Sequence, residues 1–168
     1  MPQVKWRRIK FFLITGLLLV AGLLALRFHN EFGMYRIVEV YDGDTIAVDM
    51  DGVTEKVRFI GADTPETVDP RKAVQCGGPE ASAYTHEHLK PGVRVRLVAD
   101  PLSSDRDRYN RLLRYIYLKD GSLYNQQLIT LGFARAYVGF PFTKSDDFKA
   151  AQTNASAAKR GVWSNCGV

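Results

Sequence analysis

Residues 34–60 constrain the fold of this chain more than any other part of the sequence. Three runs rich in β-formers alternate between apolar and polar residues, which is the pattern of half-buried strands; they cover 34–41, 44–50 and 55–60. Asp51-Gly52 separates the second run from the third, and this dipeptide is a strong signal for a two-residue hairpin. The sequence therefore predicts a three-stranded antiparallel meander.

The remaining pattern predicts more strands and three helices. Residues 93–99 and 112–118 alternate as strands, and residues 133–138 form a shorter one. Helices are expected over 79–89, 122–131 and 145–159, with Ser122 as the N-cap of the second. Five main strands, with helices at the end and in one crossover, indicate a β-rich α+β domain built as a five-stranded OB-fold β-barrel.

An apolar segment precedes this domain. Residues 11–26 read FFLITGLLLVAGLLAL, and four basic residues lie before them, which is typical of an export signal. A helix of this length rises about 24 Å, close to the ~30 Å hydrocarbon core of a bilayer. Because no Ala-x-Ala follows the run, we expect residues 1–30 to form an uncleaved transmembrane signal anchor; a removed signal peptide is the alternative. The body, residues 31–168, is expected outside the cytoplasm, either membrane-anchored or secreted.

The charge of the chain is concentrated around that segment. The formal net charge is +5, from 23 Lys+Arg and 18 Asp+Glu, and residues 1–30 hold five basic residues and no acidic one. The body is therefore formally neutral, and it is long enough for one hydrophobic core but not for two. Bulk charge gives no argument for nucleic-acid binding, so such an argument has to come from the site.

The chain has two cysteines, Cys76 and Cys166. An even count in an exported chain suggests a disulfide, which in the chain-entropy model would add about 4 kcal/mol by closing a loop of roughly ninety residues. Two unrelated thiols are the alternative. A metal site needs more ligands than two distant cysteines provide.

Two carboxylates are expected to meet at one end of the meander. Asp44 begins the second strand and Asp63 follows the third, and these two positions lie at the same end of an antiparallel sheet. Adjacent carboxylates repel each other, and a hard cation such as Ca²⁺ relieves that repulsion. Glu66 lies on the following turn, and Arg58 approaches the same rim within the third strand. The segment Asp107-Arg108-Tyr109-Asn110-Arg111 brings a second arginine toward the barrel.

Three segments together resemble the staphylococcal nuclease (thermonuclease) family, over about residues 35–163; they are Asp42-Gly43-Asp44-Thr45, Arg58 to Glu66, and Asp107 to Arg111. The resemblance implies a single-domain five-stranded OB barrel with three helices. It also implies Ca²⁺ ligands, catalytic residues and a nucleotide contact. The implied ligands are Asp44, Asp63 and the backbone carbonyl of Thr64; the implied catalytic residues are Arg58, Glu66 and Arg111; the contact is Tyr109, with Tyr137 as a second candidate.

These residue types suit phosphodiester hydrolysis. A Ca²⁺ ion is a Lewis acid toward a phosphate oxygen, and two guanidiniums can hold phosphate oxygens in bidentate fashion and stabilise the charge of the transition state. Glu66 can orient the attacking water or accept its proton. We therefore expect a monomeric Ca²⁺-dependent endonuclease acting on DNA and RNA outside the cytoplasm. The alternatives are a non-catalytic OB module that binds nucleic acid, or a protein partner, while tethered to the membrane.

Overall fold

The computed structural model describes residue 16, residues 33–67 and residues 73–166. The predicted membrane segment over residues 11–26 therefore lies outside the described residues, apart from Gly16. Among the described residues, no helix is long and apolar enough to span a bilayer. Residues Met34–Val168 form one compact unit, and the fold below is the fold of that unit.

Five strands close into a barrel in the order β1-β2-β3-β6-β5. Their bounds are β1 Met34–Val40, β2 Thr45–Met50, β3 Val53–Phe59, β5 Arg94–Val98 and β6 Leu112–Tyr117. The first three strands form the antiparallel meander that the alternating runs predict, and β5 closes the barrel against β1. Strand β6 pairs with β3 in parallel, a pairing that alternation by itself does not predict. The expected five-stranded barrel is confirmed.

The β2–β3 hairpin turns at the predicted dipeptide. Asp51 has φ 55° and Gly52 has φ 88°, so both central residues lie in the left-handed region that two-residue hairpins of type I′ require. The Gly52 amide donates a hydrogen bond of 2.8 Å to the Asp49 carboxylate, which further holds the turn. This tight connection sets the register in which Thr45 lies opposite Arg58 at the other end of the pair.

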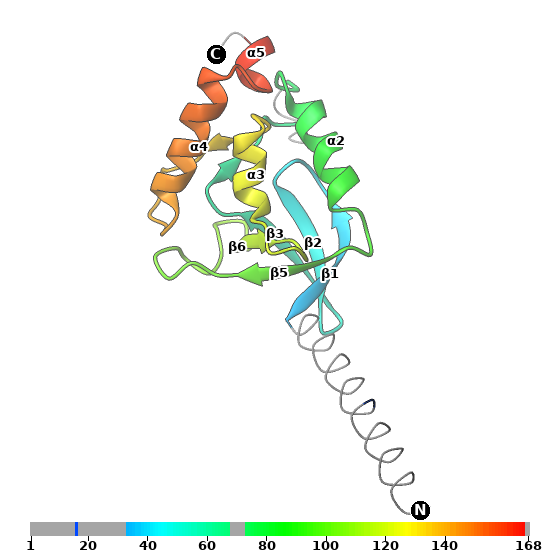
Figure 1. The fold of residues 1–168 in the computed structure, drawn as a ribbon. Coiled ribbons are helices and arrows are strands. Elements are labelled where there is room, and N and C mark those ends of the chain that lie inside the picture. The colour runs from blue at the N-terminus through cyan, green and yellow to red at the C-terminus, as the bar shows by residue number, and fades with distance from the viewer. Residues whose placement is uncertain (1–15, 17–32, 68–72, 167–168) are drawn as a thin grey trace, which may run out of the picture. The chain divides into compact units, whose positions relative to one another are not determined.

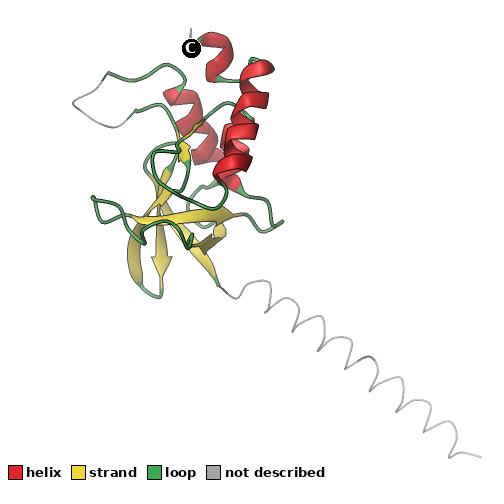
Figure 2. Ribbon diagram, turned by 90° about the vertical axis from the view of Figure 1, so that its left-hand side faces the viewer, coloured by secondary structure: helices red, strands yellow, loops and turns green. Residues whose placement is uncertain are grey.

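Helices gather at one end of the barrel, as Figures 1 and 2 show. They are α2 Gly78–His88, α3 Tyr124–Thr130, α4 Ser145–Ala157 and the short α5 Val162–Asn165, of which only α5 was not predicted. The expected N-cap at Ser122 is wrong: α3 begins one residue later than a Ser122 cap requires, after Leu123. The Ser122 hydroxyl donates to the Asp120 carboxylate instead, because that carboxylate closes its own turn with the Ser122 amide.

A separate two-stranded sheet, β4 (Ala62–Asp63) with β7 (Arg135–Ala136), lies beside the barrel. The expected strand over residues 133–138 is shorter than predicted because only two of its residues find a partner. That partner is the two-residue segment shortly after β3, which was not predicted as a strand. The pairing places Asp63 opposite Arg135 and so fixes the backbone that carries one of the candidate ligands.

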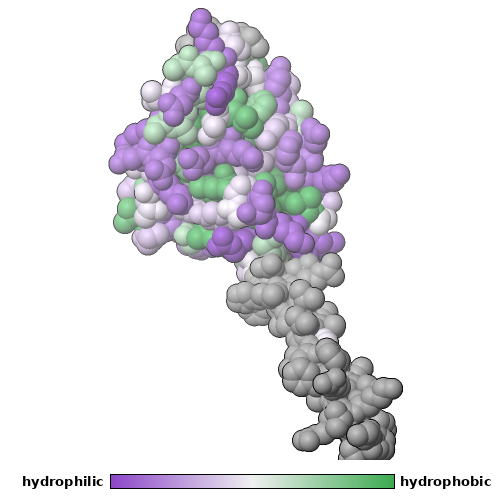
Figure 3. Space-filling view, in the orientation of Figure 1, coloured by the Kyte–Doolittle hydropathy of each residue, from purple (hydrophilic) through white to green (hydrophobic). Residues whose placement is uncertain are grey.

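Apolar side chains from the strands and from α3 and α4 fill one core; fully buried members include Ile46, Val57, Phe59, Ile116, Tyr124, Leu128 and Phe148. The face of this unit seen in Figure 3 is mostly hydrophilic, with apolar residues in small separate areas. The structure joins Cys76 and Cys166 by a disulfide, with 5.7 Å between their Cα atoms. This bridge ties the segment before α2 to the end of α5.

Candidate active site

The meander brings the first two acidic positions to one rim of the barrel. Asp44 directly precedes β2, and its backbone carbonyl accepts a hydrogen bond of 3.0 Å from the Phe59 amide at the end of β3. The Asp44 side chain is buried, although it carries a carboxylate. A carboxylate is rarely buried unless its oxygens have hydrogen-bond or ionic partners. We therefore expect the oxygens of Asp44 to have such partners.

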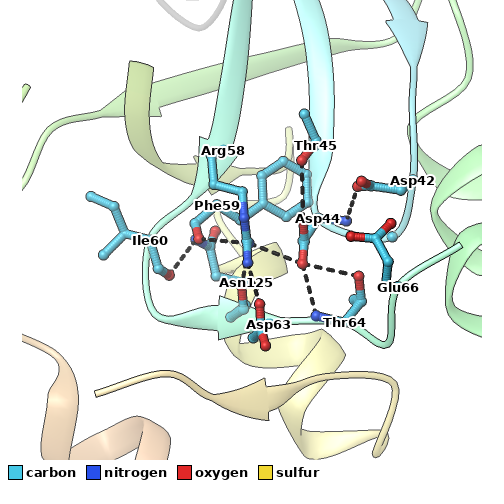
Figure 4. A network of polar contacts seen from close by, with 12 residues as sticks. Asp42, Asp44, Thr45, Arg58, Phe59, Ile60, Asp63, Thr64, Glu66 and Asn125 are labelled. Atoms are coloured by element: carbon cyan, nitrogen blue, oxygen red, sulfur yellow. Dashed lines mark hydrogen bonds and ion pairs between the residues drawn. The ribbon is translucent and has the colours of Figure 1, made fainter. Parts of the chain in front are cut away.

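Both oxygens of the Asp44 carboxylate are engaged (Figure 4). One oxygen accepts hydrogen bonds from the Thr64 amide at 2.7 Å and the Thr64 hydroxyl at 2.9 Å, and it lies 3.0 Å from the Arg58 guanidinium. The other accepts the Thr45 hydroxyl at 3.1 Å. Asp44 thereby links the start of β2 to the loop after β4.

Arg58 lies between the two candidate metal-binding carboxylates. Its guanidinium forms ion pairs with Asp44 and with Asp63, and it donates to the Ala62 carbonyl. The Arg58 side chain is only 15% exposed, whereas the Asp63 side chain is 53% exposed to solvent. Asp44 and Asp63 therefore point toward a common centre, as the strand pattern predicts, with one guanidinium between them.

The turn before Asp44 contributes groups to which the sequence pattern assigned no role. The Asp42 carboxylate accepts a hydrogen bond of 3.0 Å from the Asp44 amide. A Cβ at Gly43 would lie 2.7 Å from Thr64 Cγ2, so only glycine lets the turn approach Thr64 this closely. The buried Thr85 hydroxyl on α2 donates to the Gly43 carbonyl at 2.8 Å, and Tyr124 on α3 donates to Thr85. Helix α2 thus contacts the turn through Thr85, and α3 supports Thr85 through Tyr124.

Three carboxylates and one guanidinium give this rim an excess of negative charge. Burial raises the pKa of Asp42 to about 6, and the nearby Asp44 carboxylate adds to the rise. Partial desolvation also raises the pKa of Asp63, although half of its side chain is exposed, and the Arg58 guanidinium acts in the opposite direction. Asp42 is part of the Asp42-Gly43-Asp44-Thr45 motif, but the sequence assigned it no role because an Asp-Gly pair alone indicates only a turn.

Glu66 lies on the loop that follows β4, and Figure 4 shows its carboxylate on the same side as Asp42 and Asp44. Its backbone is paired with a residue nine positions later. The Glu66 amide donates to the side-chain oxygen of Gln75 at 2.9 Å, and the Gln75 amide donates to the Glu66 carbonyl at 3.0 Å. The Glu66 carboxylate accepts a hydrogen bond of 2.9 Å from the Thr67 amide.

Arg111 lies directly before β6, and its side chain reaches the start of β2. Its guanidinium is held by Asp107 through contacts of 2.7 Å, and it donates to the Thr45 hydroxyl at 3.3 Å. Asn110, directly before it, has φ 63°, a left-handed conformation that asparagine tolerates better than most residues. The Tyr109 side chain is 60% exposed, and the Arg111 guanidinium lies over its ring at 5.4 Å.

All eight residues that were predicted to bind metal or substrate or to act in catalysis line one cleft of about 1270 Å³; they are Asp44, Arg58, Asp63, Thr64, Glu66, Tyr109, Arg111 and Tyr137. Tyr137, which is half exposed, packs edge-on against Phe140 at the far wall. Cationic groups from two walls and exposed aromatic rings in one groove suit an anionic, ring-bearing ligand.

The residues present fit a hard divalent cation that keeps some of its waters. Within the described part of the chain, no three His, Cys, Asp or Glu side chains gather closely enough to form a complete protein cage for a metal. The observation that supports a fit is the chemistry of the donor set: Asp44 and Asp63 both lie against the Arg58 guanidinium, and the Asp42 carboxylate accepts a hydrogen bond from the Asp44 amide. Oxygen donors of this kind, completed by water and phosphate, are the usual ligands of Ca²⁺ and Mg²⁺.

Comparison with known proteins gives several matches. Residues 56–165 match the family model described as "Staphylococcal nuclease homologue". The chain is 38% identical to the thermonuclease of Staphylococcus hyicus, over 90% of this chain and 97% of that protein. It is 40% identical to the thermonuclease of Staphylococcus intermedius, over 77% of this chain and 75% of that protein. It is also 40% identical to the endonuclease YncB of Bacillus subtilis (strain 168), over 75% of this chain and 59% of that protein.

Proposed function

This chain belongs to the staphylococcal nuclease family, and on that premise we propose that it is a Ca²⁺-dependent endonuclease that hydrolyses phosphodiester bonds in DNA and RNA outside the cytoplasm. One observation carries the proposal. Arg58 and Glu66 from one segment and Arg111 from another, distant along the chain, line the same cleft as the carboxylates of Asp44 and Asp63. A protein that only bound nucleic acid would not need this combination of groups.

The two arginines are proposed to bind and stabilise the phosphate. Each guanidinium is already oriented by a carboxylate, Arg58 by Asp63 and Arg111 by Asp107, so little side-chain entropy remains to be lost when a phosphate binds. Because phosphodiester attack adds negative charge to the phosphate oxygens, two fixed guanidiniums stabilise the transition state more than the ground state.

Glu66 is proposed to handle the attacking water. Its carboxylate lies in the cleft, and its backbone is held on both sides, so it can orient a water or accept its proton. Tyr109 and Tyr137 are proposed to contact the nucleotide. Their exposed rings lie at the cleft walls, where a nucleotide base could stack on them.

Asp44, Asp63 and the carbonyl of Thr64 are the residues proposed to hold Ca²⁺. When bound there, the ion would supply Lewis-acid polarisation and charge neutralisation at a phosphate oxygen. The donor set alone does not distinguish Ca²⁺ from Mg²⁺ on charge. Ca²⁺ is proposed from the resemblance of these residues to the staphylococcal nuclease family, since a few carboxylates completed by water and phosphate also suit Mg²⁺.

The extracytoplasmic location is supported by the Cys76–Cys166 disulfide, since such bonds persist mainly in oxidising compartments. The apolar run at residues 11–26 is proposed to anchor the chain to the membrane, or to be removed on secretion. Mass measurement of the mature N-terminus distinguishes these two outcomes.

The test is a cleavage assay on plasmid DNA and on a folded RNA, with the full chain in Ca²⁺, in Mg²⁺ and in excess chelator. We expect cleavage of both substrates in Ca²⁺ only. Arg111→Ala and Glu66→Ala should each lower kcat at least a hundredfold, by analogy with lost transition-state donors. Lys149→Ala, on the exposed face of α4, is the matched control and should cleave normally. Equal cleavage with and without chelator would refute the metal assignment, and tight binding without cleavage would favour the non-catalytic module.

A further inference from the structure

We propose that Gln75 is a positioning residue for Glu66, and that the Cys76–Cys166 disulfide holds Gln75 in place. The proposal rests on the proposed function in one respect, which is that Glu66 acts on the attacking water. It extends that function to two features outside the cleft: an uncharged side chain on the surface, and a cross-link to the end of the chain. Neither Gln75 nor the two cysteines line the cleft.

The first observation is the two-way pairing between Glu66 and Gln75. The Glu66 amide donates to the Gln75 side chain at 2.9 Å, while the Gln75 amide donates to the Glu66 carbonyl at 3.0 Å. Both backbone polar groups of Glu66 are therefore bound by one residue. This fixes the backbone from which the Glu66 side chain enters the cleft, at a position that lies outside the strands and helices of the described residues.

The second observation is how closely α2 approaches the same backbone. A Cβ at the buried Gly78 would lie 3.0 Å from the Pro65 carbonyl oxygen and 3.2 Å from that of Glu66. The Gly78 amide donates to the Gln75 carbonyl at 3.0 Å. Gln75 therefore lies in a turn fixed to the start of α2, and α2 in turn lies directly against Glu66.

The third observation connects this turn to a distant part of the chain. Cys76, adjacent to Gln75, is bonded to Cys166, which is 90 positions away and caps α5. Helix α5 also contacts the turn directly, because a Cβ at Gly77 would lie 2.5 Å from Val162 Cγ1. The residue after Gln75 is thus held covalently and by packing.

The restraint of this turn by the disulfide and by α5 matters because Gln75 and Cys76 are exposed. Hydrogen bonds of an exposed side chain compete with water, so the Gln75 pairing persists only if the turn that presents it stays in place. The disulfide removes much of the freedom that the turn would otherwise have. A displacement of about 1 Å at a catalytic group can lower a rate by about a hundredfold, so the pairing of Glu66 is expected to influence kcat strongly.

The test compares two substitutions of Gln75 in the full chain with its disulfide intact. Gln75→Met keeps the length of the side chain and removes the acceptor, whereas Gln75→Glu keeps an acceptor for the Glu66 amide. We expect Gln75→Met to lower kcat about tenfold or more, with KM and the Ca²⁺ concentration for half-maximal rate within about twofold of wild type. Gln75→Glu should recover most of the lost kcat. Amide exchange at Glu66 should accelerate at least about tenfold in Gln75→Met.

The Cys76→Ser/Cys166→Ser double variant tests the second half of the proposal. It should show the same selective fall in kcat and the same faster exchange at Glu66, with Lys149→Ala as the surface control. If the double variant folds and keeps both the wild-type kcat and the wild-type exchange at Glu66, the holding role of the disulfide is overturned. If it fails to fold, the folded wild-type chain with this disulfide reduced is measured in the same way, and Gln75→Met still tests the positioning role, because its change is confined to an exposed side chain.

The outcomes separate the two proposals. A wild-type chain with Ca²⁺-dependent cleavage, together with an unchanged kcat in Gln75→Met, would overturn the positioning role alone. So would a parallel loss of Ca²⁺ response in Gln75→Met, since that would indicate general damage to the site. A wild-type chain without nuclease activity would overturn the proposed function, and the role of Gln75 in it as well.

Discussion

Replacing Asp100 by asparagine should destabilise the fold at neutral pH and have about half that effect at pH 3. Asp100 follows β5 and is only 4% exposed. One carboxylate oxygen accepts hydrogen bonds from the Tyr115 hydroxyl at 2.7 Å and the Thr143 amide at 2.8 Å, and the other accepts the Leu102 amide at 2.8 Å. An asparagine side chain has one acceptor oxygen, so it could keep the contacts of only one carboxylate oxygen and would place its NH₂ group against the donors at the other.

The magnitude follows from the pKa of this group. Burial alone would raise the pKa of Asp100, but its hydrogen bonds, those from Thr143 and Tyr115 foremost, outweigh burial and lower the pKa from 3.8 to about 2. At about 1.4 kcal/mol per unit, and allowing for solvent screening, the ionised form contributes about 1–2 kcal/mol of stability. Because the folded pKa lies below the unfolded one, this stabilisation is present above about pH 4 and is lost as the pH falls through about 2.

The assay is urea unfolding followed by circular dichroism, at pH 7 and at pH 3, with the disulfide intact. Asp100→Asn should be less stable than wild type by about 1–2 kcal/mol at pH 7, and about half of that difference should remain at pH 3. Asp146→Asn is the control, because that side chain is 93% exposed and its replacement should change stability by less than about 0.5 kcal/mol at both pH values. A difference for Asp100→Asn that is equal at the two pH values would refute the reasoning.

Three further predictions concern the site and its cross-link. Gly43→Ala should displace Thr64, whose Cγ2 lies 2.7 Å from the added methyl, and should raise the Ca²⁺ concentration for half-maximal cleavage; an unchanged Ca²⁺ titration would contradict this. Arg111→Lys keeps the charge but loses the planar fork, so kcat should fall about tenfold or more in the cleavage assay, and a wild-type rate would show that charge alone suffices. Reducing Cys76–Cys166, which are 90 positions apart, should lower the free energy of unfolding by about 4 kcal/mol in urea titrations, and a change below ~1 kcal/mol would argue against chain entropy as the cause.

Local pattern was sufficient for the three-stranded meander, because its strands and its hairpin each follow a short-range rule. The hairpin at Asp51-Gly52 requires only two residues with positive φ, and both angles are positive in the structure. The meander then follows from alternation, and it brings Asp44 and Arg58 to the same rim without any knowledge of the rest of the chain. Ser122 shows the limit of such rules. Its hydroxyl donates a hydrogen bond to the Asp120 carboxylate and does not cap the following helix.

The candidate site was harder to predict wherever a contact depends on two distant segments. Asp42 resembles an ordinary turn residue in the sequence, and only the fold shows its carboxylate at the Asp44 amide. The parallel pairing of β6 with β3, which carries Arg111 toward the cleft, cannot be derived from periodicity because parallel and antiparallel strands have the same alternation. Gln75 carries no chemical signal at all until its two hydrogen bonds to Glu66 are seen.

The sequence by itself determined the class of fold, the chemical types at the site and their order along the chain, because strand periodicity, turn residues and reactive side chains are local properties. Only the tertiary structure decided which groups meet: Arg58 between Asp44 and Asp63, Asp107 beneath Arg111, and the Cys76–Cys166 bridge beside Gln75. The physical reason is that these contacts depend on barrel closure and helix packing, which bring together residues that lie far apart along the chain.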